Sequence, residues 1–198
     1  MTPTASATPS RVPSQAELNA ALLTAAQVGP GFTLQPPGSG ISESSMTSAC
    51  PAVGNGASPS LVATAAFVAN PTSETITEVT EELLQFTPAQ AKAQLDQFAQ
   101  VAEACPEFNF QIPFTSGTID AQIGIAQEAF SGVGDQDAAI RVTAVLTTAE
   151  GNVTVSGDIF AIRHGGTVIL VVNAAIELDT DLTESVAREA YQQVAALG

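Results

Sequence analysis

The chain has 198 residues, of which 45% are apolar, so it is long enough for one domain with a core and a tail. Its 20 acidic residues against 5 basic ones give a formal charge of −15. Such a field repels phosphate backbones and anionic head groups, which excludes nucleic acid and the membrane surface as expected partners. We read the acidity first as a source of solubility, and second as an attraction for cations or basic partners. No apolar run approaches the length of about 18 residues that a membrane span needs.

The first residues differ in composition from the rest of the chain. Residues 1–14 are rich in Thr, Ser, Pro and Ala, and they predict a disordered tether in front of a single domain at 15–198. The tract lacks the basic and apolar segments of a signal peptide. It has the composition of the stretch that follows an export signal or a lipid-anchored cysteine. We therefore expect that Met1 is an added start, that a leader or lipid anchor was removed, and that the domain is a monomer.

Cys50 and Cys105 are the only two cysteines. An even number in an apparently exported chain favours a structural disulfide, which would close a loop of about 55 residues. Two buried free thiols are the alternative in a reducing compartment. A zinc site is disfavoured because the single histidine, His164, lacks any suitable spacing to the cysteines. The sequence thus predicts an extracellular or cell-envelope location, with no metal and no cofactor.

The N-terminal part of the domain predicts a helix, a loop and a hairpin. Ser14 and Glu17 have the spacing of a capping box, and the helix that they begin ends at residues 29–31 (Gly-Pro-Gly). Residues 32–60 predict mostly loop, with at most a short strand near 40–47. A strand follows at 61–70, with alternate apolar side chains on one face, and residues 75–86 predict its hairpin partner. In that partner we expect Glu81 and Glu82 to be solvated.

A second helix is predicted after Thr87, which is the expected N-cap, with Pro88 as the first helical residue. Its apolar positions recur every three or four residues and end at Cys105, which places this cysteine on the buried side. Residues 106–116 predict an aromatic connection bounded by prolines. This placement suits a disulfide that ties the end of the helix to the loop near Cys50.

Four strand candidates then follow one another at 117–128, 138–149, 152–163 and 166–178. Tight-turn signals separate the later ones, which predicts an antiparallel meander. The last strand is apolar on both faces and should lie centrally in the sheet. Asp179 is the expected cap of a final helix at 182–197. The predicted fold is therefore α+β, with an antiparallel sheet of about six strands, two to three helices and one disulfide.

No catalytic constellation is recognisable, and we expect the protein not to be an enzyme. His164 is expected at an exposed hairpin tip, where a lone histidine is usually a turn residue. No nucleophile motif is present, and neither cysteine has a local base. Asp135 and Asp137 faintly suggest a calcium loop, without its full ligand pattern. Asp179 and Asp181 are explained most simply as helix caps.

Three phenylalanines in the connection form the candidate ligand cleft. Phe108, Phe110 and Phe114 are an even number of residues apart, so their rings can lie on a common side. One interpretation is a satellite core beneath a loop. The other is the wall of an apolar cleft against the sheet, in which a small lipid-like or other apolar molecule could bind.

Together these features resemble a known family. They include the Thr/Pro-rich tail, the Leu-Leu-Thr-Ala-Ala-Gln stretch at 22–27, the Cys-Pro pairs at 50–51 and 105–106, and the Ile-Arg-His-Gly-Gly-Thr-Val stretch at 162–168. The chain is similar, over about residues 15–197, to actinobacterial extracytoplasmic sensor domains. That family includes the extracellular domain of a mycobacterial receptor serine/threonine kinase and many lipoproteins. The kinase-linked member has two disulfides, whereas this chain can form only one. This chain also contains no kinase motif.

The resemblance implies an α+β domain with a cleft for an unidentified ligand and without enzymatic activity. We therefore expect a non-catalytic binding or sensor domain of the cell envelope, either lipid-anchored or secreted. Its expected partner is an unknown small molecule or an envelope protein. The alternatives are an envelope module for protein–protein interaction or structure, which would use a sheet face or edge, and a hydrolase with an unfamiliar site.

Overall fold

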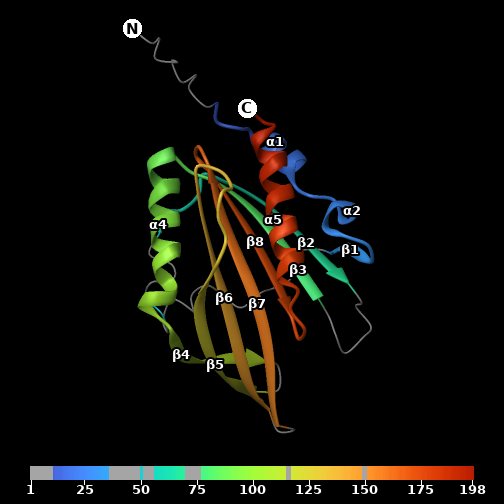
Figure 1. Cartoon of the computed structure of the whole chain (residues 1–198), viewed down its shortest axis with the longest axis vertical. Coiled ribbons are helices and arrows are strands. Elements are labelled where there is room, and N and C mark those ends of the chain that lie inside the picture. The colour runs from blue at the N-terminus through green and yellow to red at the C-terminus, as the bar shows by residue number, and fades with distance from the viewer. Residues whose placement is uncertain (1–10, 36–49, 51–55, 70–76, 115–116, 149–150) are drawn as a thin grey trace.

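The structure is a computed structural model of the chain. It describes residues 11–35, 50, 56–69, 77–114, 117–148 and 151–198, apart from the side chains of residues 110, 112–114 and 117. Within these ranges, eight strands form one antiparallel sheet in the order β1-β2-β3-β8-β7-β6-β5-β4, and four helices accompany it (Figure 1). The α+β class is confirmed. The expectation of about six strands and two to three helices was too low.

The elements have the following bounds. The strands are β1 (Phe32–Gln35), β2 (Leu61–Ala69), β3 (Thr77–Gln85), β4 (Glu107–Phe114), β5 (Gly117–Glu128), β6 (Gln136–Thr148), β7 (Gly151–His164) and β8 (Thr167–Ala175). The helices are α1 (Gln15–Ala21), α2 (Ala25–Val28), α4 (Pro88–Ala104) and α5 (Thr180–Ala195). None of the helices in the described ranges is long and apolar enough to cross a membrane.

The predicted N-terminal helix is in fact two short helices. Ser14 and Glu17 form the expected capping box at the start of α1. The helix ends at Leu22, whose backbone is extended, and α2 begins only after Thr24. The interruption has a physical reason, because the Leu23 N–H donates to the side chain of Glu81 on β3 at 2.8 Å. This tertiary hydrogen bond takes the place of one that a continuous helix would make.

The meander predicted in the C-terminal half is present. β5, β6, β7 and β8 pair in sequence as antiparallel neighbours. β8 also pairs with β3 over Thr77–Gln85, so this apolar strand is internal, as predicted. The β3–β8 pairing joins the early β2–β3 hairpin to the late meander in one sheet.

Two of the additional elements are the edge strands of the sheet. β1 pairs with β2 where only loop was expected, and the possible strand near 40–47 lies outside the described residues. β4 pairs with β5, so the predicted connection at 106–116 is largely a strand. β4 has apolar residues at every second position, 108, 110, 112 and 114, but it is flanked by proline at 106 and contains Pro113, whereas β1 has only four residues, too few for a clear alternation.

Side chains on the two faces of the sheet form separate apolar clusters. One cluster lies under α1, α2 and α5 and includes Phe67, Leu83, Phe160 and Ile169. A second cluster joins α4 to Ile123, Ile125 and Ile140. Beyond these helices, β5, β6 and β7 extend toward the end of the molecule that lies opposite the chain termini (Figure 1). Part of the sheet therefore has no described helix over it.

The predicted disulfide is present between Cys50 and Cys105, with a Cα–Cα distance of 6.0 Å. Cys50 is fully buried, and Cys105 is the C-cap of α4, as the helix pattern predicted. The bond ties the segment before β2 to the end of the helix on the other side of the hairpin. Thr87 and Pro88 begin this helix as expected, with a capping box to Gln90.

Candidate functional site

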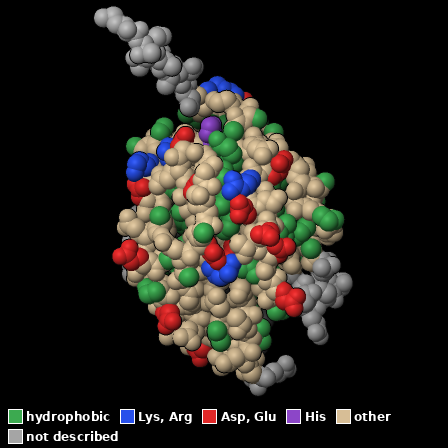
Figure 2. Space-filling view, viewed as in Figure 1, with side chains coloured by type: hydrophobic (Ala, Val, Ile, Leu, Met, Phe, Trp, Pro, Cys, Tyr) green, Lys and Arg blue, Asp and Glu red, His purple; other side chains and the backbone are tan. Residues whose placement is uncertain are grey.

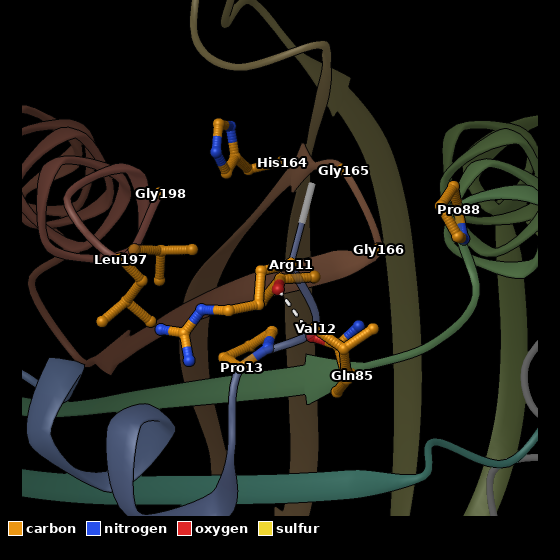
Figure 3. A pocket seen from close by; sticks show the side chains of 12 residues that line it. Arg11, Val12, Pro13, Gln85, Pro88, His164, Gly165, Gly166, Leu197 and Gly198 are labelled. Carbon is orange, nitrogen blue, oxygen red and sulfur yellow. Dashed lines mark hydrogen bonds between the residues drawn. The ribbon is translucent and has the colours of Figure 1, made fainter. Parts of the chain in front are cut away.

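A small cavity lies where the end of β3, the β7–β8 turn and the end of α5 meet (Figure 3). Its volume is about 80 Å³, room for a few water molecules and well below the size of a typical ligand pocket. The N-terminal segment 11–13 forms part of its wall. Other lining residues include Gln85, His164, Thr167 and Leu197.

Hydrogen bonds fix the polar part of this cavity. Gln85 is buried, its Nε2 donates to the Phe86 carbonyl at 2.7 Å, and its Oε1 accepts from the Thr167 hydroxyl at 2.9 Å. The Phe86 N–H donates to the Gly166 carbonyl at 2.8 Å. The side-chain amide of Gln85 thus connects the end of β3 to the start of β8, next to the β7–β8 turn. These contacts favour a structural role for Gln85.

His164 differs from its expected position at an exposed tip. It is half-buried, and its ring meets Tyr191 of α5 edge-on at a centroid distance of 5.8 Å. Its Nδ1 atom is buried and has no hydrogen-bond partner within the described ranges. A general base needs an orienting partner and a nearby nucleophile. The contacts of His164 therefore support packing against α5 and give no support to acid–base catalysis.

The proposed apolar cleft at the three phenylalanines stays a prediction. Phe108 is partly buried and packs against the cluster that joins α4 to the sheet, which agrees with the satellite-core interpretation for this ring. The side chains of Phe110 and Phe114 lie outside the described part. Their strand is β4, with Phe108 opposite Ile123 and Phe110 opposite Ala121.

A larger hollow lies on the opposite face of the same strands. Its volume is about 450 Å³, and it is lined mainly by exposed polar side chains of β4, β5 and β6: Asn109, Gln111, Asp120, Gln122 and Thr147. Gln111 Nε2 donates to Asp120 Oδ1 at 2.9 Å, which orients both groups across the β4–β5 pair. The lining combines amide donors, amide and carboxylate acceptors and a hydroxyl. Sequence reasoning missed it, because the connection at 106–116 was not expected to be a strand.

The surroundings of the hollow are weakly charged for so acidic a protein. β7 continues the same face with Asn152, Thr154 and Ser156, paired to Thr147, Val145 and Thr143 of β6. Figure 2, viewed as Figure 1, shows acidic side chains scattered over the molecule and mostly neutral atoms toward the end away from the C-terminus. The sheet surface around the hollow therefore offers hydrogen bonds more than ionic contacts.

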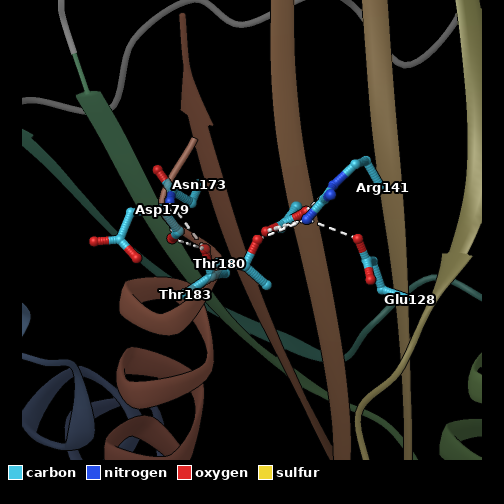
Figure 4. A network of polar contacts seen from close by, with 7 residues as sticks. Glu128, Arg141, Asn173, Asp179, Thr180 and Thr183 are labelled. Atoms are coloured by element: carbon cyan, nitrogen blue, oxygen red, sulfur yellow. Dashed lines mark hydrogen bonds and ion pairs between the residues drawn. The ribbon is translucent and has the colours of Figure 1, made fainter. Parts of the chain in front are cut away.

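A charged network separates this polar surface from α5 (Figure 4). Arg141 on β6 bonds Glu128 at 2.6 Å, Asp158 at 3.0 Å and the Thr180 hydroxyl at 2.6 Å. Asp158 is fully buried, and the hydrogen bond to it raises the pKa of Arg141. The network links three strands to the first turn of α5, so it positions the helix.

Three of the remaining paired carboxylates, Asp135, Asp137 and Asp179, have structural partners. Asp135 accepts from the Gly165 N–H at 2.7 Å, and Asp137 accepts from the Val133 N–H at 2.8 Å. Asp179 caps α5 by accepting from the Leu182 N–H, as expected. In the described ranges, no group of three or more His, Cys, Asp or Glu side chains is arranged to hold a metal ion.

The prediction that Glu81 is solvated was wrong. It is fully buried on β3, on the same face as Val79 and Leu83. Burial raises the pKa of Glu81 to about 7, and the Leu23 N–H, which favours the ionised form, offsets only part of this effect. Its Oε1 is buried without a partner among the described residues. The signal in the sequence was the alternation Val79, Glu81, Leu83, Gln85, which places the carboxyl among core positions.

Comparison with known proteins gives a likeness in fold. No protein-family model matches the chain, and no curated protein matches it. The crystal structure of the extracellular domain of PknH from Mycobacterium tuberculosis is similar, with a TM-score of 0.57 and 12% identity over 94% of this chain and 98% of that one. An X-ray structure of an uncharacterised Rv0999 ortholog from Mycobacterium smegmatis gives a TM-score of 0.43 and 14% identity over 91% and 94%. The first likeness shows that this chain shares the fold of an extracellular domain.

Proposed function

We propose that the protein is a non-catalytic, extracytoplasmic sensor-like domain of a cell envelope. The observation that carries the proposal is the shared fold with the PknH extracellular domain, which extends over nearly the whole of both chains. The disulfide between Cys50 and Cys105 supports the same compartment, because such bonds persist in oxidising surroundings. A secreted form or a form attached by a lipid anchor would both satisfy the proposal.

The location can be tested on the native protein. Cells expressing the untagged gene are fractionated, free thiols are blocked at once with an alkylating reagent, and the intact mass is measured before and after reduction. We expect the protein in the envelope or the medium, with both cysteines protected until reduction. Recovery from the cytosol with two alkylated cysteines would overturn the proposal. The mass of the native N-terminus distinguishes a lipid-anchored form from a secreted one.

For the ligand, we propose a neutral, polyhydroxylated molecule bound at the hollow between β4 and β6. Its side chains supply donors and acceptors side by side, which is what a row of sugar-like hydroxyls requires. Its low local charge fits a neutral ligand better than a charged one. This surface replaces the apolar cleft as our preferred site, because Phe108 already packs against the α4 cluster.

Titration with soluble neutral oligosaccharides, followed by amide chemical shifts of the labelled chain, tests this site. Shifts should concentrate in β4, β5 and β6. They should disappear in Gln122→Ala, and they should persist in the control Gln100→Ala, which removes an exposed glutamine from α4. Equal loss of binding in both variants, or shifts confined to other strands, would contradict the site while leaving the proposed location intact.

An envelope interaction module is the second candidate, and the position of β4 favours it. β4 lies at one edge of the described sheet, with β5 as its strand neighbour. An edge strand can pair with an added strand from another chain. Sedimentation of the pure protein, followed by capture experiments with an envelope extract, tests this role. A specific partner that is lost when Asn109→Pro removes a backbone donor of β4 would favour the module over the sensor.

A further inference from the structure

Glu81 is a buried acid placed directly beneath the interruption between α1 and α2. It lies in the middle of β3, opposite Ala65 of β2 and Val171 of β8, both of which are buried. Its Oε2 accepts the Leu23 N–H at 2.8 Å, and Leu23 itself is buried. This contact connects the central sheet to the short connection between the two helices.

No charged partner faces this carboxyl from the described elements that pack near it. β2, β8 and α2 contain no charged residue. The charged residue of α1, Glu17, is partly exposed and bonded to Arg11. On the same sheet face, Asp158 is paired with Arg141.

The helix α5 contributes mainly apolar side chains to this cluster, including Val186, Ala187 and Ala190. Its titratable residues are Asp181 in the first turn, Glu184, Arg188, Glu189 and Tyr191. Glu184 and Arg188 pair with each other, and Glu189 accepts from Gln27 and Gln193. Tyr191 meets the ring of His164. The charged groups of Glu184, Arg188 and Glu189 are thus bonded to residues other than Glu81, and Tyr191 packs against the same apolar cluster.

The neutral and ionised forms of Glu81 have different requirements. A neutral carboxyl can remain in an apolar core with one hydrogen bond, whereas a carboxylate needs partners or water at both oxygens. The Leu23 N–H satisfies one oxygen only, and Oε1 has no described partner. Ionisation would strengthen the Leu23 hydrogen bond, but the unmet need for solvation at Oε1 outweighs that gain. Oε1 is shielded from bulk solvent in the closed form, and movement of an element above the sheet would expose it.

The cover formed by α1 and α2 consists of two short helices. α1 has 7 residues and α2 has 4, whereas α5 has 16. The buried side chains of the cover are few: Leu18, Ala21, Leu23 and Val28. We propose that Glu81 acts as a proton-controlled latch, which keeps the α1–α2 segment seated on the sheet when the carboxyl is neutral and releases it toward an open, hydrated form when the carboxyl ionises.

The pH range of the latch follows from linkage. The closed form has the raised pKa of about 7, and the open form has the ordinary value of about 4.3 for glutamate. The closed state is therefore favoured fully below the lower value, and its advantage is lost as pH rises toward 7. Well above pH 7 Glu81 is ionised in both forms, and the equilibrium between the closed and open forms no longer depends on pH. Glu17 titrates outside this range, because hydrogen bonds from Arg11 and Ser14 hold its pKa at about 2.

Hydrogen exchange of the whole chain between pH 5 and 8.5 tests the latch, after correction for the intrinsic pH dependence of amide exchange. Protection of residues 15–28 should fall about 40-fold between pH 5 and 7 and then level off. α4, on the other face of the sheet, should keep its protection. Glu81→Gln should give pH-independent protection at residues 15–28, because an amide does not ionise.

Two control variants separate the latch from other acids. Glu82→Gln changes the neighbouring carboxyl on the other face of β3, and Glu189→Gln changes the acid that bonds Gln27 of α2. Both should retain the wild-type pH profile. The latch is overturned if either control removes the profile, if Glu81→Gln retains it, or if α4 loses protection in parallel with α1 and α2.

Direct titration of wild-type Glu81 keeps the proposal testable even if Glu81→Gln folds poorly. The side-chain carboxyl carbon is observed by NMR in labelled protein. A midpoint near pH 7 supports the latch. A midpoint near the ordinary glutamate value means that the carboxyl is already hydrated, which would falsify it.

Discussion

Arg141 lies directly opposite Asp158 in the β6–β7 pair, and its Nε donates to the buried Oδ1 of that aspartate at 3.0 Å. Arg141 also bonds the Thr180 hydroxyl at the start of α5. One guanidinium therefore compensates a buried charge and fixes the entry of the last helix. A cation with these two contacts should matter more to stability than one in an exposed ion pair.

Arg141→Met should lower the free energy of unfolding by about 3 kcal/mol, because it leaves the carboxylate of Asp158 buried without its cation. Lys92→Met is the matched control, since it removes the exposed partner of Asp96 on α4 and should cost less than about 1 kcal/mol. Urea unfolding of both variants provides the measurement. Equal losses would show that the Asp158 pair is no more important than a surface pair.

Loss of the disulfide should destabilise the fold by about 4 kcal/mol, because the bond closes a loop across 55 residues of sequence separation. The double variant Cys50→Ser, Cys105→Ser should unfold at a lower urea concentration than the oxidised wild type. Added reductant should lower the wild-type midpoint toward that of the double variant and leave the variant unchanged. An unchanged midpoint for the reduced wild type would contradict a stabilising role for this bond.

Glu81 should make the wild-type protein less stable at neutral pH than its carboxamide variant. The folded-state pKa of about 7 lies above the ordinary glutamate value, so the unfolded chain releases its proton first as pH rises. The stability of Glu81→Gln relative to wild type should therefore rise by about 3 kcal/mol between pH 4.5 and 7.5. Chemical unfolding at several pH values measures this difference. A difference that does not change with pH would show that Glu81 is solvated in the folded state.

Gly134 and Gly132 provide a matched pair for backbone strain. Both have a positive φ, 71° and 82°, which a residue with a Cβ adopts at a cost of about 1 to 3 kcal/mol. A Cβ at Gly134 would also lie 2.5 Å from the Arg163 carbonyl oxygen. A Cβ at Gly132 would have no atom within 4 Å. Gly134→Ala should therefore lower the thermal midpoint clearly more than Gly132→Ala. A similar loss in both would mean that the loop moves away from β7 without penalty.

The parts of the fold that the sequence predicted correctly are those with strong local signals. Thr87 and Pro88 mark the start of α4 because a cap and a proline define it within a few residues. The turn at Gly165 and Gly166 and the apolar pattern of β8 predicted the end of the meander and a central last strand. Each of these signals depends on neighbours in the chain, so one sequence is enough to find it.

The parts that were missed depend on distant contacts. β1 is a strand because Phe32 and Gln35 lie beside Ala69 and Ala66 of β2, a pairing that no local pattern shows. The burial of Glu81 requires a cover from α1 and α2, and the half-burial of His164 depends on Tyr191 of α5. Charged and turn-forming residue types usually lie in solvent. Glu81 and His164 depart from this expectation because tertiary contacts bury Glu81 fully and His164 partly.

The pairing of β3 with β8 also constrains the order in which the molecule can assemble. Thr77 lies opposite Ala175. During synthesis from the N-terminus, the β2–β3 hairpin is therefore made long before β8, the strand that pairs with β3 on its other side. Contacts of such sequence separation form slowly, and an early hairpin with a free edge is open to association with other chains. A truncated product that stops before β8 should therefore aggregate rather than persist as a folded half.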